Sequence, residues 1–144
     1  MRKKDPRHRA REAALQILYQ WEIGQGPVGR AAETFFDLQW PDQTPPSDEL
    51  REFATQLAHD TVARLDAIDP LIAESAEHWR PERMAVLDRL ILRMAVCEML
   101  RDRTTPAPVV INEALELART FSTEDAVKFI NGVLDTIRKK LDAR

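Results

Sequence analysis

Residues 108–141 carry apolar side chains at helical spacing on both sides of a short corner at 120–122. This pattern constrains the fold more than any other stretch, because it predicts two consecutive amphipathic helices. Pro108 suits the first turn of the first helix, where no backbone N–H is needed. Ser122 is expected to cap the second helix, with Asp125 completing a capping-box-like pair. The stripes expected in the core are Val110, Ala114, Leu117 and Ala118, then Ala126, Ile130, Val133, Leu134, Ile137 and Leu141.

Helical periodicity covers most of the remaining chain as well. The expected helices run over about residues 7–23, 28–39, 47–65, 69–79 and 81–101. The second should bury Phe35, Phe36 and Leu38, and Ser47 should cap the third. The last is apolar on two faces, which is typical of a helix central to the core or covered by another molecule. No segment alternates with period two for long enough to predict a strand.

We therefore predict an all-α fold of six or seven helices. The Arg80–Pro81 junction is the expected boundary between two packed helical halves, about 7–80 and 81–142, after a basic arm at 1–6. A chain of 144 residues can bury roughly 70% of its unfolded surface, so it needs no disulfide or metal. Cys97, the only cysteine, lies amid apolar residues and is expected to be buried. Because no membrane span or secretory signal is recognisable, the expected compartment is the cytoplasm.

The charges of the chain are unevenly distributed. The net charge is −3, yet residues 1–11 hold six basic residues and one acid, while the remainder holds 15 basic and 23 acidic residues. A basic end on an acidic body suggests a polyanion at that end, although a short basic terminus also serves solubility alone. The basic residues are Arg2, Lys3, Lys4, Arg7, Arg9 and Arg11.

Two aromatic residues lie beside the predicted core stripes. Tyr19 continues a helical line from Arg11, so its ring either packs at the core edge or offers a stacking face beside the basic cluster. Phe129 lies on a mostly polar line. Either Phe129 edges the core and Gly132 admits a crossing helix, or the line is a shallow surface with an aromatic platform for a base or a partner side chain. The other members of that line are Asp125 and Thr136.

The sequence offers no recognisable catalytic site. Its glycines form no phosphate-binding loop, and none of its three histidines has a second His or Cys at metal-ligand spacing. The carboxylates are scattered over faces expected in water. We therefore expect a protein that binds rather than catalyses, without a cofactor or a metal.

Two long blocks resemble the NusB family of bacterial transcription antitermination proteins. They are RHRAREAALQILYQWE near the N-terminus and VINEALELARTFSTEDAVKFINGVLD near the C-terminus, in the family's order. The resemblance covers essentially the whole chain and implies two three-helix halves. It also implies binding to the boxA element of ribosomal RNA leaders. This binding occurs with the small-subunit ribosomal protein NusE, in an antitermination complex on RNA polymerase.

The resemblance also implies which residues bind. The family's RNA-binding positions are an arginine-rich block, a tyrosine of the first helix and an acidic–aromatic pair. In this chain they fall on Arg7, Arg9, Arg11, Tyr19, Asp125 and Phe129, with His8 interrupting the arginines. Lys3 and Lys4 join the set for their charge. The implied NusE-binding surface includes Asp88, Arg89 and Arg93.

Two other functions remain open. One is a helical protein-interaction module that binds no RNA. The other is the RNA-binding module of an rRNA cytosine methyltransferase, which shares this fold but needs a following cofactor-binding domain that we do not expect here. The sequence is compatible with both a monomer and a homodimer.

Overall fold

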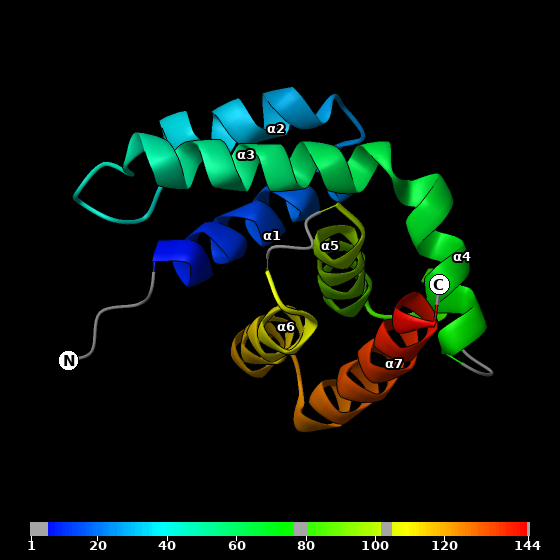
Figure 1. The fold of residues 1–144 in the computed structure, drawn as a ribbon. Coiled ribbons are helices and arrows are strands. Elements are labelled where there is room, and N and C mark those ends of the chain that lie inside the picture. The colour runs from blue at the N-terminus through cyan, green and yellow to red at the C-terminus, as the bar shows by residue number, and fades with distance from the viewer. Residues whose placement is uncertain (1–5, 77–80, 102–104, 144) are drawn as a thin grey trace. The chain divides into compact units, whose positions relative to one another are not determined.

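The structure is a computed structural model that describes residues 6–76, 81–101 and 105–143. Within these residues every regular element is a helix, which confirms the predicted all-α fold (Figure 1). None of these helices is long and apolar enough to cross a membrane. Backbone contacts group the chain into two units, Met1–Val62 and Ala63–Arg144. The boundary predicted at Arg80–Pro81 stays a prediction, because Arg80 lies outside the described residues.

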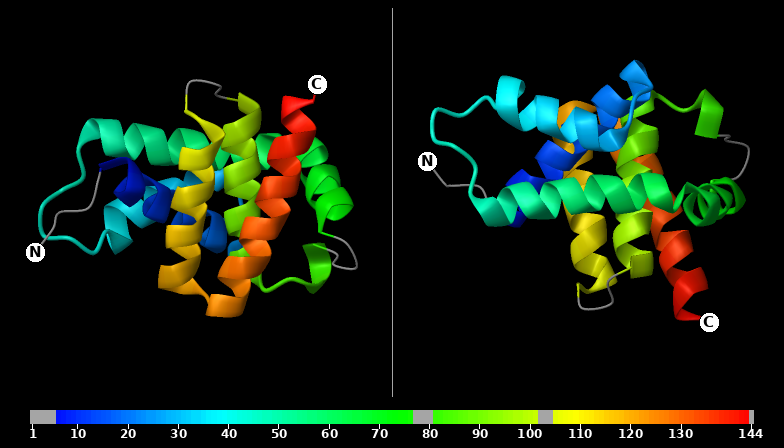
Figure 2. Two further views of the ribbon diagram at one scale, coloured as in Figure 1. Left: turned by 60° about the horizontal axis from the view of Figure 1, so that its bottom comes forward. Right: turned by 90° about the horizontal axis from the view of Figure 1, so that it is seen from above.

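The N-terminal unit contains α1 (Pro6–Gly24), α2 (Val28–Thr34), the π-helix η1 (Phe35–Gln39) and α3 (Asp48–Ala63). A side chain on Gly29 of α2 would contact the His59 ring of α3 at 3.6 Å, so α2 lies along α3 (Figures 1 and 2). Ser47 caps α3 as predicted, since its Oγ accepts a hydrogen bond from the Leu50 backbone N–H at 3.1 Å.

The π-helix η1 builds an aromatic cluster. Phe35 and Phe36 are buried, and their ring centroids lie 6.0 and 5.8 Å from that of Trp40. Leu38, in contrast, is 81% exposed, so its predicted burial is wrong. A π-helix turns less per residue than an α-helix. Leu38, which α-helical spacing would place on the inner face with Phe35, is therefore rotated towards solvent.

The C-terminal unit contains α4 (Leu65–Ser75), a short 3₁₀ helix η2 (Pro81–Arg83), α5 (Val86–Arg101), α6 (Ala107–Phe121) and α7 (Glu124–Asp142). α5 contacts α4, α6 and α7, and Figure 2 shows α5, α6 and α7 side by side. Nearly all of α5 from Leu90 to Met99 is buried, including Cys97. Of the two interpretations of this helix, the burial supports the one in which α5 is central to the core.

The two helices predicted around the corner at 120–122 are present, and every residue of their predicted stripes is buried. The predicted cap is wrong by one residue. Thr123 caps α7, because its Oγ1 accepts from the Ala126 N–H at 3.1 Å. Ser122 instead donates to Asp88 Oδ1 on α5 at 2.6 Å, so its hydroxyl ties the corner to the neighbouring helix.

The break between α3 and α4 also differs from the sequence prediction. α3 ends at Ala63 and α4 begins at Leu65, whereas we expected one helix to end near 65 and the next to begin at Asp69–Pro70. Pro70 lies inside α4.

Candidate nucleic-acid interface

The first turns of α1 place three arginines against aromatic rings of the N-terminal unit. The guanidinium carbon of Arg7 lies 4.3 Å from the centroid of the Phe53 ring, and that of Arg11 lies 5.5 Å from the same ring. Arg7 and Arg11 are four residues apart, so they share one face of α1. Arg9 lies 4.5 Å from the Trp40 ring. A guanidinium stacked on a ring has a fixed plane, and its N–H groups point outward from the edge of that plane.

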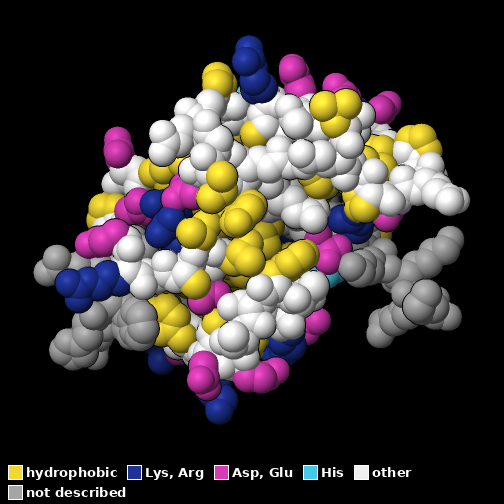
Figure 3. All heavy atoms as spheres, turned by 180° about the vertical axis from the view of Figure 1, so that it is seen from behind, with side chains coloured by type: hydrophobic (Ala, Val, Ile, Leu, Met, Phe, Trp, Pro, Cys, Tyr) yellow, Lys and Arg dark blue, Asp and Glu magenta, His cyan; other side chains and the backbone are white. Residues whose placement is uncertain are grey.

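The three arginines differ in their access to solvent and in their ionic neighbours. Arg7 is exposed, whereas Arg11 is only 5% exposed. Arg9 Nε lies 3.4 Å from Asp42 Oδ2, and Arg9 Nη1 lies 3.7 Å from Glu12 Oε1. Figure 3 shows basic and acidic side chains interspersed over one face. The predicted contacts of Lys3 and Lys4 lie outside the described residues.

Tyr19 lies further along α1. Its side chain is 43% exposed, whereas Leu15 on the same helical line is buried. Tyr19 lies ten positions beyond Arg9, or about 15 Å along the helix axis. The accessible ring meets the requirement for stacking on a base, so both interpretations of Tyr19 are compatible with its position.

The polar line on α7 is a surface and not a helix crossing. Asp125 and Thr136 are exposed, and Phe129 is half-buried. A β-carbon at Gly132 would have no described neighbour within 4 Å. The interpretation that Gly132 admits a crossing helix is therefore wrong. Whether this line and the arginines of α1 form one RNA-binding surface stays a prediction, because the two belong to different units.

The residues expected to bind NusE are engaged in contacts within the C-terminal unit. Asp88 accepts the Ser122 hydroxyl proton, as described above. Arg93 forms a two-pronged ion pair with Asp69, with both N···O distances at 2.9 Å. Arg89 is half-buried on the same helix. Asp88 and Arg93 therefore stabilise the unit, whether or not they also contact a partner.

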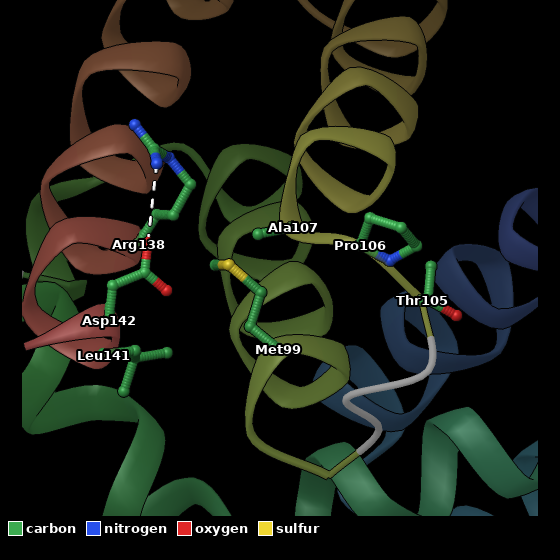
Figure 4. Close-up of a pocket in the computed structure, with 7 residues that line it drawn as sticks. All are labelled: Met99, Thr105, Pro106, Ala107, Arg138, Leu141 and Asp142. Carbon is green, nitrogen blue, oxygen red and sulfur yellow. Dashed lines mark ion pairs between the residues drawn. The ribbon is translucent and has the colours of Figure 1, made fainter. Parts of the chain in front are cut away.

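Two hollows lie between helices of the C-terminal unit. The smaller, about 110 Å³, lies where α5 ends and α6 begins, beside Arg138 and Asp142 of α7 (Figure 4). These two side chains form an ion pair at 3.5 Å, and the volume is below the roughly 300 Å³ of ordinary small-molecule sites. The larger is an open groove of about 430 Å³ between α6 and α7, lined by Asn112, Asn131 and Asp135 among others. Across the described residues, no three His, Cys, Asp or Glu side chains are placed to hold a metal.

Trp40 and Phe53 are the functional candidates that sequence reasoning missed. Each contacts an arginine of α1 from more than 30 positions away, as the Arg9–Asp42 pair does across 33 positions. Periodicity along one helix carries no information about such pairs. The one available signal is a tryptophan and an aspartate in a proline-rich loop, at Trp40–Pro46.

Residues 8–139 match the model of the NusB family. A transcription antitermination protein NusB from Solibacter usitatus is 49% identical over 135 residues, covering 94% of this chain and 90% of the relative. The structure of T. maritima NusB has a TM-score of 0.83 at 33% identity, covering 96% of this chain and 94% of the other. A structure of antitermination factors NusB and NusE in complex with dsRNA has a TM-score of 0.82 at 25% identity, covering 94% and 97%.

Proposed function

The chain belongs to the NusB family of transcription antitermination proteins, and from this premise we propose that it binds RNA as an antitermination factor. Its RNA ligand is the boxA element of ribosomal RNA operon leaders. It binds boxA together with NusE, and the pair supports antitermination by RNA polymerase in the cytoplasm. The related NusB–NusE structure that holds RNA supports this proposal. The role is one of binding, not of catalysis.

The arrangement at the start of α1 is the observation that carries the proposal. Aromatic rings hold Arg7 and Arg9 in defined positions, where their N–H groups suit the oxygen atoms of a phosphate. Phosphate contacts supply affinity without sequence preference, whereas bases that stack on rings supply the preference. Tyr19 on α1 and Phe129 on α7 are the proposed stacking residues. Asp125 is proposed to accept hydrogen bonds from a base.

The test is the affinity for a labelled boxA RNA, measured by fluorescence anisotropy at about 0.1 M salt with and without NusE. Arg9→Glu should weaken binding by about tenfold or more, because it removes a phosphate contact and adds repulsion. Arg30→Glu, the same change at an exposed residue of α2, is the matched control and should change affinity much less. Helical content should be unchanged in both variants, whereas the melting temperature should fall in Arg9→Glu alone, because Glu12 and Asp42 lose their cation.

Tyr19 has its own pair of controls. Tyr19→Ala should weaken binding by about fivefold or more, because one stacked base contributes ~1–3 kcal/mol. Ile23→Ala removes another exposed side chain one turn further along α1 and should have little effect. Tyr19→Phe keeps the ring and should keep most of the affinity. If Arg9→Glu and Tyr19→Ala both bind boxA RNA as the wild type does, this RNA-binding surface is wrong.

NusE binding is tested separately. Asp88→Lys reverses a charge on α5 and should weaken the complex with NusE, whereas Arg9→Glu should leave that complex intact. A protein-interaction module without RNA binding would show a different result. It would bind NusE normally, and boxA RNA would bind to the mixture no better than to NusE alone.

A further inference from the structure

Arg9 is surrounded by three groups of its own unit. The guanidinium carbon lies over the Trp40 ring, 4.5 Å from its centroid. Asp42 approaches Nε at 3.4 Å, and Glu12 approaches Nη1 at 3.7 Å. The Trp40 indole N–H donates to the Thr44 carbonyl at 2.9 Å and so closes the loop that carries Asp42. The loop therefore brings a ring and a carboxylate to the same arginine.

The two carboxylates beside Arg9 differ in how easily another anion can displace them from the guanidinium. The Glu12 side chain is 4% exposed and lies on α1 itself, three residues from Arg9. The Asp42 side chain is 52% exposed and contacts Arg9 through one long distance of 3.4 Å. The Arg9 side chain is 16% exposed, so this pair is open to water mainly on the side of Asp42. Ion pairs with one exposed partner and a single long contact contribute little and are screened by salt. Asp42 is thus the carboxylate that another anion can displace.

A carboxylate and a phosphate present similar oxygen atoms to a guanidinium. Resting on the RNA-binding function proposed above, we propose that Asp42 is an intramolecular competitor for RNA. Its carboxylate takes the position of a backbone phosphate on Arg9 until RNA displaces it. Trp40 is a positioning residue, because its ring stays in contact with the guanidinium while the anion beside it is exchanged. RNA binding is weakened by this competition, which favours ligands that make further contacts beyond Arg9.

The same unit contains a matched pair that lacks the connection to α1. Arg51 of α3 lies 5.1 Å from the Phe36 ring and 3.2 Å from Asp37 Oδ1. It repeats the arrangement of arginine, ring and exposed aspartate. Asp37→Asn therefore removes the same charge from an arginine–aspartate pair whose arginine is more exposed, at 44% against 16% for Arg9. It controls for a general rise in attraction to a polyanion.

The experiment compares Asp42→Asn with Asp37→Asn in the full chain with NusE, using boxA RNA at about 0.1 M salt. Asp42→Asn should bind about two- to fivefold more tightly than the wild type, as loss of an exposed ion pair predicts. Asp37→Asn should stay within about twofold of the wild type. In an Arg9→Gln background the gain from Asp42→Asn should disappear, because the group for which it competes is gone.

Trp40 is tested with two variants. Trp40→Leu should weaken binding several-fold at unchanged helical content, whereas Trp40→Phe, which keeps a ring, should restore most of the affinity. If Trp40→Leu fails to fold, the Asp42→Asn comparison still decides the matter.

The outcomes separate this inference from the proposed function. If Asp42→Asn binds no more tightly than Asp37→Asn while Arg9→Gln weakens binding, the competition is wrong and the RNA-binding function stands. If the gain persists in the Arg9→Gln background, the competition does not act through Arg9, and the inference is also wrong. If the wild type with NusE does not bind boxA RNA, the proposed function is wrong and the inference falls with it.

Discussion

At the scale of single residues, Arg93 illustrates how one side chain links two helices. It lies on α5 and binds Asp69 of α4 through two hydrogen bonds of 2.9 Å. The Arg93 side chain is 11% exposed, so water replaces little of this pair if it is broken. A bidentate guanidinium–carboxylate pair in such a position is stronger than an exposed one.

We expect Asp69→Ala to lower the free energy of unfolding by about 1–2 kcal/mol, because a mostly buried guanidinium loses its partner. For a chain of this length that is a fall of roughly 2–8 °C in melting temperature. Thermal unfolding followed by circular dichroism measures it. Asp37→Ala breaks the exposed pair with Arg51 and should cost less than about 0.5 kcal/mol. Equal losses in the two variants would show that Arg93 is not held as described.

The sequence predicts well which apolar residues of α6 and α7 are buried. It predicts poorly which way a single side chain points. The apolar stripes of α6 and α7 follow from spacing alone, and all are buried. Ser122 and Thr123 have the same chemistry at adjacent positions, so the sequence does not show which hydroxyl faces α5. Leu38 was misplaced because nothing in its neighbourhood signals a π-helix. Trp40 and Phe53 contact arginines from distant positions, which spacing does not reveal.

At the scale of elements, α7 depends on its first turn. Thr123 satisfies the Ala126 N–H, one of the four donors that a helix start leaves without a helical partner. We expect Thr123→Ala to cost about 1 kcal/mol of stability, measured by chemical denaturation. Thr136→Ala is the matched control. The Thr136 hydroxyl donates to the Gly132 carbonyl inside the helix, and its loss should be close to neutral. A neutral Thr123→Ala would contradict the assigned cap.

The second half of α7 contains ion pairs between residues that are three or four positions apart. Asp135 accepts a hydrogen bond from Arg138 at 2.8 Å and pairs with Lys139 at 3.1 Å. These two hydrogen bonds, with Arg138 the larger cause, hold the pKa of the Asp135 carboxyl below its ordinary value of 3.8. Because the folded-state pKa is lowered, the pair stabilises the fold above about pH 4. The contribution is lost as the pH falls through the lower, folded-state pKa.

We therefore expect Arg138→Gln to raise the pKa of Asp135 towards 3.8. The side-chain carboxyl can be followed by NMR between about pH 2 and 5. Lys128→Gln removes an exposed charge from the same helix two turns earlier and should leave the Asp135 titration unchanged. A pKa that does not move in Arg138→Gln would mean that Lys139 alone causes the shift.

The helices themselves are largely predictable, because apolar side chains recur along them at helical spacing. Their ends were less so. The break between α3 and α4 at Arg64 contains no glycine or proline. The helical spacing of apolar residues therefore predicts one helix that continues to Leu65. The sequence predicts a helix start at Asp69–Pro70, yet Pro70 lies inside α4. Proline signals a boundary only on average, and the packing of α4 against α5 decides here.

At the scale of the whole molecule, the uneven charge predicts how RNA binding depends on salt. Each cation that neutralises a phosphate of a single strand adds about 0.7 to the slope of log affinity against log salt. Replacing both Lys3 and Lys4 by glutamine should therefore reduce the slope by up to about 1.4. Replacing Lys139 and Lys140 removes the same charge from α7, where they pair with Asp135 and Glu74, and should reduce it little. Equal slopes in the two double variants would refute an RNA contact of the arm.

The fold class followed from the sequence because helical periodicity and two long family blocks agree with each other. The proposed RNA-binding surface could be predicted only in part from the residues themselves. The arginines of α1 and the polar line of α7 belong to separate contact units, and their combination rests on the family resemblance. No local pattern within either unit specifies which faces of the two act together. That is a property of the assembled fold and of its ligand.

Gly132 and Cys97 together offer a reporter position. The chain's single native thiol is buried in α5, whereas a side chain at residue 132 projects into open space one turn beyond Phe129. A Gly132→Cys variant can thus be labelled with a fluorophore at one place while the native thiol is shielded. The dye would sit on the α7 face proposed to meet RNA, and its emission would register each arrival and departure of the ligand in real time.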